Sequence, residues 1–247
     1  MTELENRIRE LWEQRDQLGP ADSVAVAAVT EAIDLLDRGD ARVAEMGADG
    51  EVVVHDWLKL AILLWFRVSE MDTMELAPYE YVDKVPLKKD YAAQGVRVVP
   101  GASARWGAHL EPGTVMMPSY VNIGARVGSG TMVDTWATVG SCAQIGRNVH
   151  LSGGVGIGGV LEPAMAAPVM VGDDCFIGSR CIVASGARVG EGAVLGAGCI
   201  LTDSMPVIAP ASRLSPFRPR IASPVSIPIP IAPISPGKGA RTTLRPV

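Results

Sequence analysis

Histidines and cysteines are the side chains best suited to act as bases, nucleophiles or metal ligands, and this chain has few of them. It has four cysteines and three histidines, which are His55, His109 and His150. The cysteines form no CxxC pair, so the sequence predicts neither a disulfide framework nor a zinc site. The spacing of the histidines does not predict a three-histidine metal centre. We therefore expect no metal site.

A polar segment with catalytic potential begins two residues after His150. It consists of Ser152, Gly153 and Gly154. A hydroxyl group and closely spaced backbone N–H groups can bind the oxyanion that develops when a carbonyl group is attacked. The same residues can instead form a tight turn with no role in binding. Both interpretations stay open from the sequence.

The element that carries this segment is a repeat with a period of six. Aliphatic residues recur every six residues from Val115 to Ile157 and again from Val171 to Leu201, and a small residue usually follows four positions later. This period fits neither an α-helix nor a hairpin strand. It fits short strands joined by tight turns, with one aliphatic and one small side chain pointing into a narrow core. The sequence predicts a parallel β-helix of hexapeptide repeats over residues 91–208.

The repeat is interrupted between Ile157 and Val171. The gap is two residues longer than two hexads and contains Pro163 and Pro168. We therefore predict that a loop leaves the β-helix near residues 158–170. Loops displaced from a rigid scaffold often carry binding residues, although a harmless insertion would have the same pattern.

Residues 1–90 are predicted to form a helical N-terminal domain. Thr2 and Glu5 have the spacing of a capping box. A second helix is expected from Asp22 or Ser23 to Gly39, and a third helix with Asp56 as its N-cap. Residues 52–54 are valines that fit a short strand. The apolar stripes of these helices are interpreted as core or subunit contacts.

Residues 209–247 differ in composition from the rest of the chain. They include nine prolines, six Lys or Arg residues and no acidic residue. Such a composition disfavours both sheets and helices, and it predicts an irregular, proline-rich and disordered tail.

The whole chain has a formal net charge of −5, so no nucleic-acid or membrane partner is indicated. No apolar run reaches the roughly 18 residues that a membrane span requires. The acidic, helix-like start does not fit a secretion signal. A cytoplasmic protein is therefore expected.

Non-repetitive sequence words go beyond the generic hexapeptide pattern. The stretch Gly113 to Pro163 closely resembles tetrahydrodipicolinate N-succinyltransferase. The words LDRGDARVAE, DKVPLK, GVRVVP and CFIGSR resemble the same family. The resemblance extends from the N-terminus to about Ile208. It implies a left-handed β-helix and a homotrimer, with substrates bound in a groove between neighbouring subunits.

The family resemblance also implies an activity in lysine and diaminopimelate biosynthesis. Members transfer a succinyl group from succinyl-CoA to the amine of ring-opened tetrahydrodipicolinate, giving N-succinyl-2-amino-6-ketopimelate. Succinyl-CoA is then a co-substrate, and no permanently bound cofactor is implied. In this context the segment Ser152 to Gly154 is a candidate contact for the pantetheine arm or the thioester oxyanion.

Two positions match the substrate-binding residues of this family. They are Arg97 in GVRVVP and Asp134 in TMVDTWATVG. An arginine can hold one carboxylate of the dicarboxylate acceptor in a bidentate way. An aspartate can orient the protonated amine and help to remove its proton, so Asp134 is also the catalytic candidate. A solvated strand arginine and a turn-stabilising aspartate are the alternatives, and a direct role for His150 is less favoured.

The chain also departs from the family pattern. Many relatives have a glutamate in the coil after the CFIG word, where this chain reads CIVASG from Cys181 to Gly186. The family's C-terminal part, which helps to form the coenzyme A pocket, is replaced by the proline-rich tail. The alternatives are therefore an inactive or impaired trimeric scaffold of the same family and a relative that uses acetyl-CoA.

Overall fold

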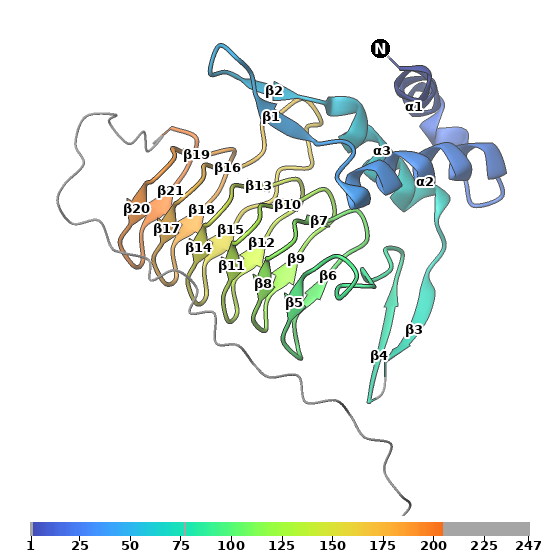
Figure 1. The fold of residues 1–247 in the computed structure, drawn as a ribbon. Helices are drawn as coiled ribbons and strands as arrows, with labels where there is room; N and C mark the ends of the chain where they lie inside the picture. Colours follow the sequence, from blue (N-terminus) through green and yellow to red (C-terminus); the bar gives the residue numbers. More distant parts are fainter. Residues whose placement is uncertain (1, 77, 205–247) are drawn as a thin grey trace, which may run out of the picture. The chain divides into compact units, whose positions relative to one another are not determined.

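The computed structural model describes residues 2–76 and 78–204 (Figure 1). The tail predicted for residues 209–247 lies outside the described residues. Within the described part, three helices precede a parallel β-helix, and all of these elements belong to one compact unit. The two main features of the sequence prediction, a helical N-terminal region and a hexapeptide β-helix, are confirmed.

The helices begin where their capping residues predict, with one exception, and the second helix ends at Gly39 as expected. They are α1 (Glu3–Glu13), the short 3-10 helix η1 (Arg15–Gln17), α2 (Ser23–Arg38) and α3 (Asp56–Val68). The side chain of Thr2 accepts a hydrogen bond from the Glu5 backbone N–H at 3.2 Å, and that of Asp22 accepts one from Ala25 at 3.0 Å.

The exception is Asp56, which was predicted to be the N-cap of α3. The cap is His55, and Asp56 is the first helical residue. The Asp56 carboxylate instead forms an ion pair with Arg9 of α1 at 2.6 Å. A tertiary partner has therefore replaced the local capping role. A negative charge in the first turn still stabilises the helix through its dipole.

Two antiparallel hairpins accompany the helices. Strand β1 (Ala44–Met46) pairs with β2 (Val52–Val54), which confirms the strand predicted for the three valines. Strand β3 (Asp72–Leu76) pairs with β4 (Tyr79–Asp83), and the sequence analysis did not predict this hairpin. In the described residues, none of the helices has the length and apolar character needed to cross a membrane.

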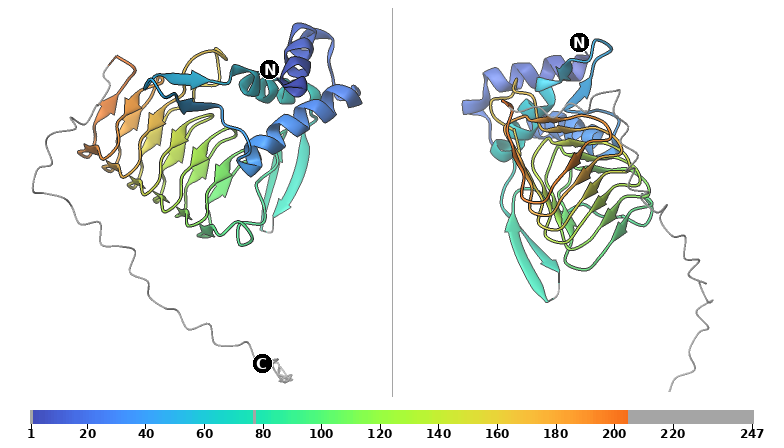
Figure 2. Two further views of the ribbon diagram at one scale, coloured as in Figure 1. Left: turned by 45° about the horizontal axis from the view of Figure 1, so that its top comes forward. Right: turned by 90° about the vertical axis from the view of Figure 1, so that its left-hand side faces the viewer.

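The β-helix consists of two-residue strands that form three parallel sheets around a common core (Figure 2). The first sheet contains β5 (Arg97–Val98), β8 (Val115–Met116), β11 (Met132–Val133), β14 (His150–Leu151), β17 (Phe176–Ile177) and β20 (Val194–Leu195). The second contains β6 (Ser103–Ala104), β9 (Tyr120–Val121), β12 (Thr138–Val139), β15 (Gly156–Ile157), β18 (Ile182–Val183) and β21 (Ile200–Leu201). The third contains β7 (His109–Leu110), β10 (Arg126–Val127), β13 (Gln144–Ile145), β16 (Met170–Val171) and β19 (Arg188–Val189).

The second residue of almost every strand is buried in the core, and the first faces outward. The period of six therefore identifies the buried residues correctly, except at the start of the repeat. Val115 was assigned to the core, but Met116 is fully buried there and Val115 is only partly buried. The next core residue is Val121, five positions later, because this turn is one residue shorter than the others.

The segment between β15 and β16 forms no helix or strand. It contacts the helices, since the fully buried Lys59 of α3 donates a hydrogen bond from Nζ to the backbone oxygen of Ala166 at 2.6 Å. Leu161 and Ala164 pack against the same cluster as the helices. This cluster also includes Ile123 and Cys142 of the β-helix. The insertion therefore helps to join the helices to the β-helix.

Candidate functional site

Asp134 lies at the end of β11, where the backbone alternation turns its side chain out of the core. The preceding residue, Val133, is fully buried. Oδ1 of Asp134 accepts hydrogen bonds from the backbone N–H of Thr135 at 2.6 Å and from the Thr135 hydroxyl at 3.2 Å. Oδ2 carries no hydrogen bond from a described residue. The carboxylate is thus fixed through one oxygen and available through the other, an arrangement suited to binding a ligand cation.

His150 of β14 is the nearest basic group to that free oxygen. Its Nε2 lies 3.8 Å from Oδ2 of Asp134, which is an ion-pair distance and too long for a hydrogen bond. The imidazole ring stacks on Phe176 of β17, with 5.2 Å between centroids and 7° between planes. The sequence analysis gave His150 little weight. The coil length could have identified it. Three hexads make one turn of the β-helix, so His150 lies beside Met132, two residues before Asp134.

Ser152, Gly153 and Gly154 follow β14 on the coil next to Asp134. The backbone N–H groups of Ser152 and Gly154 are occupied, since they donate to Ile177 at 3.0 Å and to Thr135 at 2.9 Å. The Ser152 hydroxyl is buried, and within the described residues it has no hydrogen-bond partner. The Gly153 N–H also donates no hydrogen bond within the described residues, and Gly153 is less buried than Ser152.

Arg97 of β5 lies in the same sheet but is not brought to Asp134 within one chain. It pairs with Val115 of β8, which pairs in turn with Met132 of β11. Two strand spacings separate Arg97 from the coil of Asp134, or about 10 Å. Arg97 is exposed, and its guanidinium forms no hydrogen bond or ion pair with any residue of the described ranges. Its role as a carboxylate ligand stays a prediction.

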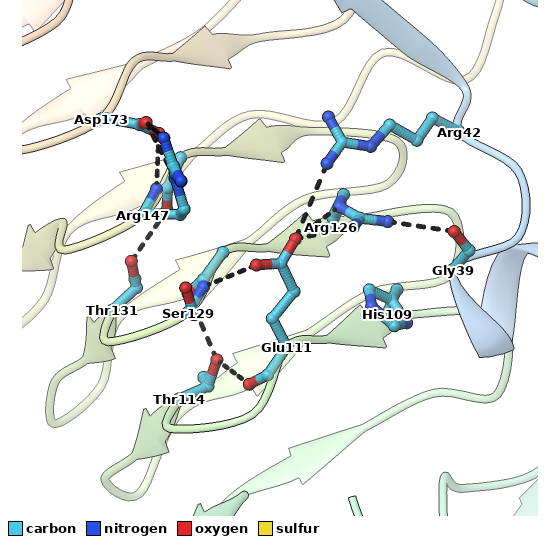
Figure 3. Close-up of polar contacts among 12 residues, drawn as sticks. Gly39, Arg42, His109, Glu111, Thr114, Arg126, Ser129, Thr131, Arg147 and Asp173 are labelled. Carbon is cyan, nitrogen blue, oxygen red and sulfur yellow. Dashed lines mark hydrogen bonds and ion pairs between the residues drawn. The ribbon is translucent and has the colours of Figure 1, made fainter. Parts of the chain in front are cut away.

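A second polar group lies on the third sheet and lines a cleft of about 510 Å³ beside β1 (Figure 3). Oε1 of Glu111 accepts two hydrogen bonds from Arg126, at 2.6 and 3.1 Å, and Oε2 accepts one from the Ser129 N–H at 2.9 Å. Arg42 approaches Oε1 to 3.6 Å. None of the predicted site residues lines this cleft.

The pKa shifts in this second group indicate that its charged side chains are paired with one another. Burial raises the pKa of Glu111, but the hydrogen bonds from Ser129 and Arg126 outweigh it, so that the pKa lies below its usual value. Burial, followed by the charge of Arg126, lowers the pKa of Arg42. We call Arg42, Glu111, Arg126 and Ser129 the third-sheet brace, because these contacts connect the segment after α2 to successive coils. In the described ranges no cluster of three or more potential metal ligands occurs.

Fold and sequence together define the class of this protein. It is a hexapeptide-repeat β-helix protein with a helical N-terminal region and a carboxylate–histidine pair on one sheet. Residues 3–68 match the family model described as "Tetrahydrodipicolinate N-succinyltransferase N-terminal", and residues 168–203 match "Hexapeptide repeat of succinyl-transferase". The chain belongs to the tetrahydrodipicolinate N-succinyltransferase family, as the sequence resemblance implied.

Curated relatives support this assignment. A protein of Aeromonas hydrophila named 2,3,4,5-tetrahydropyridine-2,6-dicarboxylate N-succinyltransferase is 57% identical over 183 residues, covering 71% of this chain. One of Yersinia pestis with the same name is 53% identical over 183 residues and 71% of this chain. The present chain spans 66% of the length of each of these two relatives.

Similar solved structures are more distant. They include PerB from Caulobacter crescentus in complex with CoA and GDP-perosamine, with a TM-score of 0.38 and 20% identity. That match covers 43% of this chain and 48% of PerB. A putative acetyltransferase of Bacillus cereus has a TM-score of 0.29 and 17% identity, with 47% of this chain and 71% of that protein covered. Neither likeness is close enough to carry an argument about the site.

Proposed function

We propose that this chain transfers a succinyl group from succinyl-CoA to the amine of ring-opened tetrahydrodipicolinate, in lysine and diaminopimelate biosynthesis. The observation that carries the proposal is the carboxylate of Asp134, which is held through one oxygen and open at the other. This residue stands in a sequence word that matches the family's substrate-binding aspartate. The product is N-succinyl-2-amino-6-ketopimelate, and the protein acts in the cytoplasm without a permanently bound cofactor.

In this proposal Asp134 binds the protonated amine of the acceptor and helps to remove its proton. Arg97 holds a carboxylate of the acceptor through its planar guanidinium. The neutral amine attacks the thioester carbonyl, a C–N bond forms, and the C–S bond breaks as coenzyme A leaves with the electron pair. In this proposal the Gly153 N–H stabilises the oxyanion between these two steps, and Ser152 and Gly154 shape the turn that carries it.

Cys142 and Cys175 are unsuited to form an acyl-enzyme intermediate, which favours direct transfer. Burial raises the pKa of the Cys142 thiol to about 12 and that of the Cys175 thiol to about 11. Both thiols are therefore protonated at neutral pH and poor nucleophiles. Each is also enclosed in the core, so a thioester substrate has no access to it.

We further propose that the active form is a homotrimer with the substrate groove shared between subunits. Large apolar side chains are exposed on the first and second sheets and at the corner between them. They are Trp136, Phe176, Ile182, Val194 and Ile200. A closed three-fold assembly would bury them. In this arrangement the helical domain of residues 1–90 and the β-helix of residues 91–208 both belong to each subunit, and the substrates bind beside the first-sheet contacts between neighbouring subunits.

The test is a direct assay of the purified full chain. Initial rates are measured with succinyl-CoA and with acetyl-CoA, and the product is identified by mass spectrometry. We expect succinylated acceptor to form, with a clear preference for succinyl-CoA. Absence of any acylated acceptor, in a preparation that sedimentation shows to be folded and trimeric, would contradict the proposed activity and favour a scaffold.

A further inference from the structure

The β1–β2 hairpin is fastened to the third sheet at two points. Shortly before the hairpin begins, the backbone oxygen of Gly39 accepts a hydrogen bond from Nη1 of Arg126 at 3.4 Å. In the hairpin turn, the backbone oxygen of Gly50 accepts one from Nη2 of Arg188 at 2.7 Å. Arg126 and Arg188 are the first residues of β10 and β19, and the strands β13 and β16 lie between these two. The hairpin is therefore held beside β13 and β16.

The space between the hairpin and these strands is the cleft of about 510 Å³ beside β1. Small-molecule sites commonly have volumes of about 300–1,000 Å³. Met46 of β1 and Met170 of β16 line the cleft and give it an apolar surface, and Met46 is 51% exposed. The exposed apolar residues assigned to the subunit contacts do not line it. The cleft is therefore distinct from the interface proposed for the trimer.

Three arginines line this cleft, and two of them have a carboxylate partner within hydrogen-bond distance. Arg126 donates to Glu111 at 2.6 and 3.1 Å, and Arg147 donates to Asp173 at 2.7 and 3.0 Å. The third is Arg42, whose side chain donates no hydrogen bond to a residue of the described ranges. Its contact with Oε1 of Glu111 is 3.6 Å long, and Arg126 already occupies that oxygen (Figure 3). The Arg42 side chain is 41% exposed, so a ligand can reach it from solvent.

The charge of Arg42 is only partly compensated in the folded chain. Burial, followed by the charge of Arg126, lowers its pKa. Three carboxylates that line the cleft raise the pKa by less, those of Glu111, Glu45 and Asp173. Because an arginine stays charged at neutral pH, a further anion beside this guanidinium would be stabilised.

We propose that this cleft binds a small carboxylate with an aliphatic chain, at a site separate from that of the transfer reaction. The carboxylate pairs with Arg42, whose planar guanidinium can donate two parallel hydrogen bonds to it. The chain lies against Met46 and Met170, because flexible thioether side chains adapt to apolar ligands. The ligand connects the hairpin to the third sheet between the two arginine contacts that fasten it. This inference does not depend on the proposed activity.

The experiment follows isotope-labelled methionine methyl groups of the full-length chain by NMR during titration with hexanoate, butyrate, hexanol or norleucine. Met46 and Met170 report on the cleft. Met132 of β11 is two residues from Asp134 and reports on the candidate active site. Each of the three signals is assigned by a leucine substitution at that position. The titrations therefore give both the affinity of each probe and the place where it binds.

Four variants separate the contributions to binding. Arg42→Gln removes the charge, Arg42→Lys keeps the charge without the fork, and Met46→Gln makes an exposed apolar side chain polar. Arg7→Gln is the matched control, because Arg7 is an exposed arginine on α1 whose partner is Glu10 of the same helix. Thermal unfolding and sedimentation show whether each variant is folded.

We expect hexanoate to shift the Met46 and Met170 signals of the parent and of Arg7→Gln, and hexanol to bind about tenfold more weakly or less. Butyrate should bind about tenfold more weakly than hexanoate, because two methylenes are lost. Arg42→Gln should bind hexanoate no better than hexanol, and Arg42→Lys should have an intermediate affinity. Met46→Gln, followed through Met170, should reduce the difference between hexanoate and butyrate. Norleucine carries an added ammonium group, so binding as tight as that of hexanoate would assign the site to amino acids and weaker binding to simple carboxylates.

Three results would overturn the inference. One is a parent in which hexanoate shifts only the Met132 signal or no signal, which would leave the cleft without this ligand. Another is equal binding of hexanoate and hexanol by the parent, which would show that no carboxylate is recognised. The third is a folded Arg42→Gln chain that keeps the parent's affinity for hexanoate. If Arg42→Gln does not fold, Arg42→Lys and Met46→Gln decide the question, because parent-like affinities in both would contradict the site.

Discussion

The first and third sheets of the β-helix both present a carboxylate next to basic side chains, but the two groups are completed in different ways. Glu111 on the third sheet accepts hydrogen bonds through both oxygens, from Arg126 and from Ser129 (Figure 3). Asp134 near the first sheet accepts them through one oxygen, from the residue that follows it. A carboxylate that accepts hydrogen bonds from the protein through both oxygens fastens parts of the chain together. One with an oxygen that accepts none can receive a substrate.

The largest effect is expected for Asp134→Asn, which tests whether this carboxylate binds substrate or only stabilises the fold. Asp134→Asn keeps the size of the side chain and loses the charge that binds the amine. We predict a fall in turnover on the order of 10²-fold or more, the range typical of a lost general base. The melting temperature should change little. Steady-state kinetics and thermal unfolding measure both quantities, and parent-like turnover would remove Asp134 from the site.

The matched change in the third-sheet brace should have the opposite outcome. Glu111→Gln leaves the guanidinium of Arg126 without its charged partner in a partly buried position. We predict a loss of about 1–3 kcal/mol in the free energy of unfolding, with kcat nearly unchanged. Chemical denaturation provides the measurement. If Glu111→Gln instead lowered turnover as strongly as Asp134→Asn, the distinction between the brace and the site would fail.

The pH dependence of stability should also identify Glu111 as a residue that stabilises the fold. The pKa of Glu111 is lower in the folded chain than its ordinary value. Its contribution is therefore fully present above its unfolded pKa and is lost as the pH falls through the lower, folded value. The difference in melting temperature between the parent and Glu111→Gln should be constant near neutrality and shrink from about pH 4 downward. A difference that grows on acidification would contradict this assignment.

A smaller effect is expected at Arg97. Arg97→Lys keeps a positive charge but replaces a planar fork by a point charge. We predict a several-fold rise in the KM for the acceptor, with kcat and the KM for succinyl-CoA nearly unchanged. Arg7→Lys is the control, since Arg7 lies on an exposed face of α1. An unchanged KM for the acceptor would assign Arg97 to the solvated surface of the strand.

The sequence predicted the fold well because the repeat is local. Each strand exposes one residue and buries the next, so a period of six reports the core directly. The error at Val115 arose where one turn is shorter and the frame passes to Met116. The misassigned cap at Asp56 arose because a distant residue, Arg9, competes for the same carboxylate.

The site was less accessible to sequence reasoning. Asp134 was found through its motif, but its neighbour His150 belongs to the next coil and becomes adjacent only when three hexads are counted as one turn.

The hydrogen bond from Lys59 to Ala166 has a consequence for how this chain can vary. Burial lowers the pKa of the Lys59 ammonium, and its acceptor is a main-chain oxygen. Every amino acid supplies that oxygen, so the identity of residue 166 is free to drift. The length of the insertion is not, because adding or removing a residue before position 166 would move the carbonyl out of reach. Among homologous chains we therefore expect this loop to tolerate substitutions more readily than insertions or deletions.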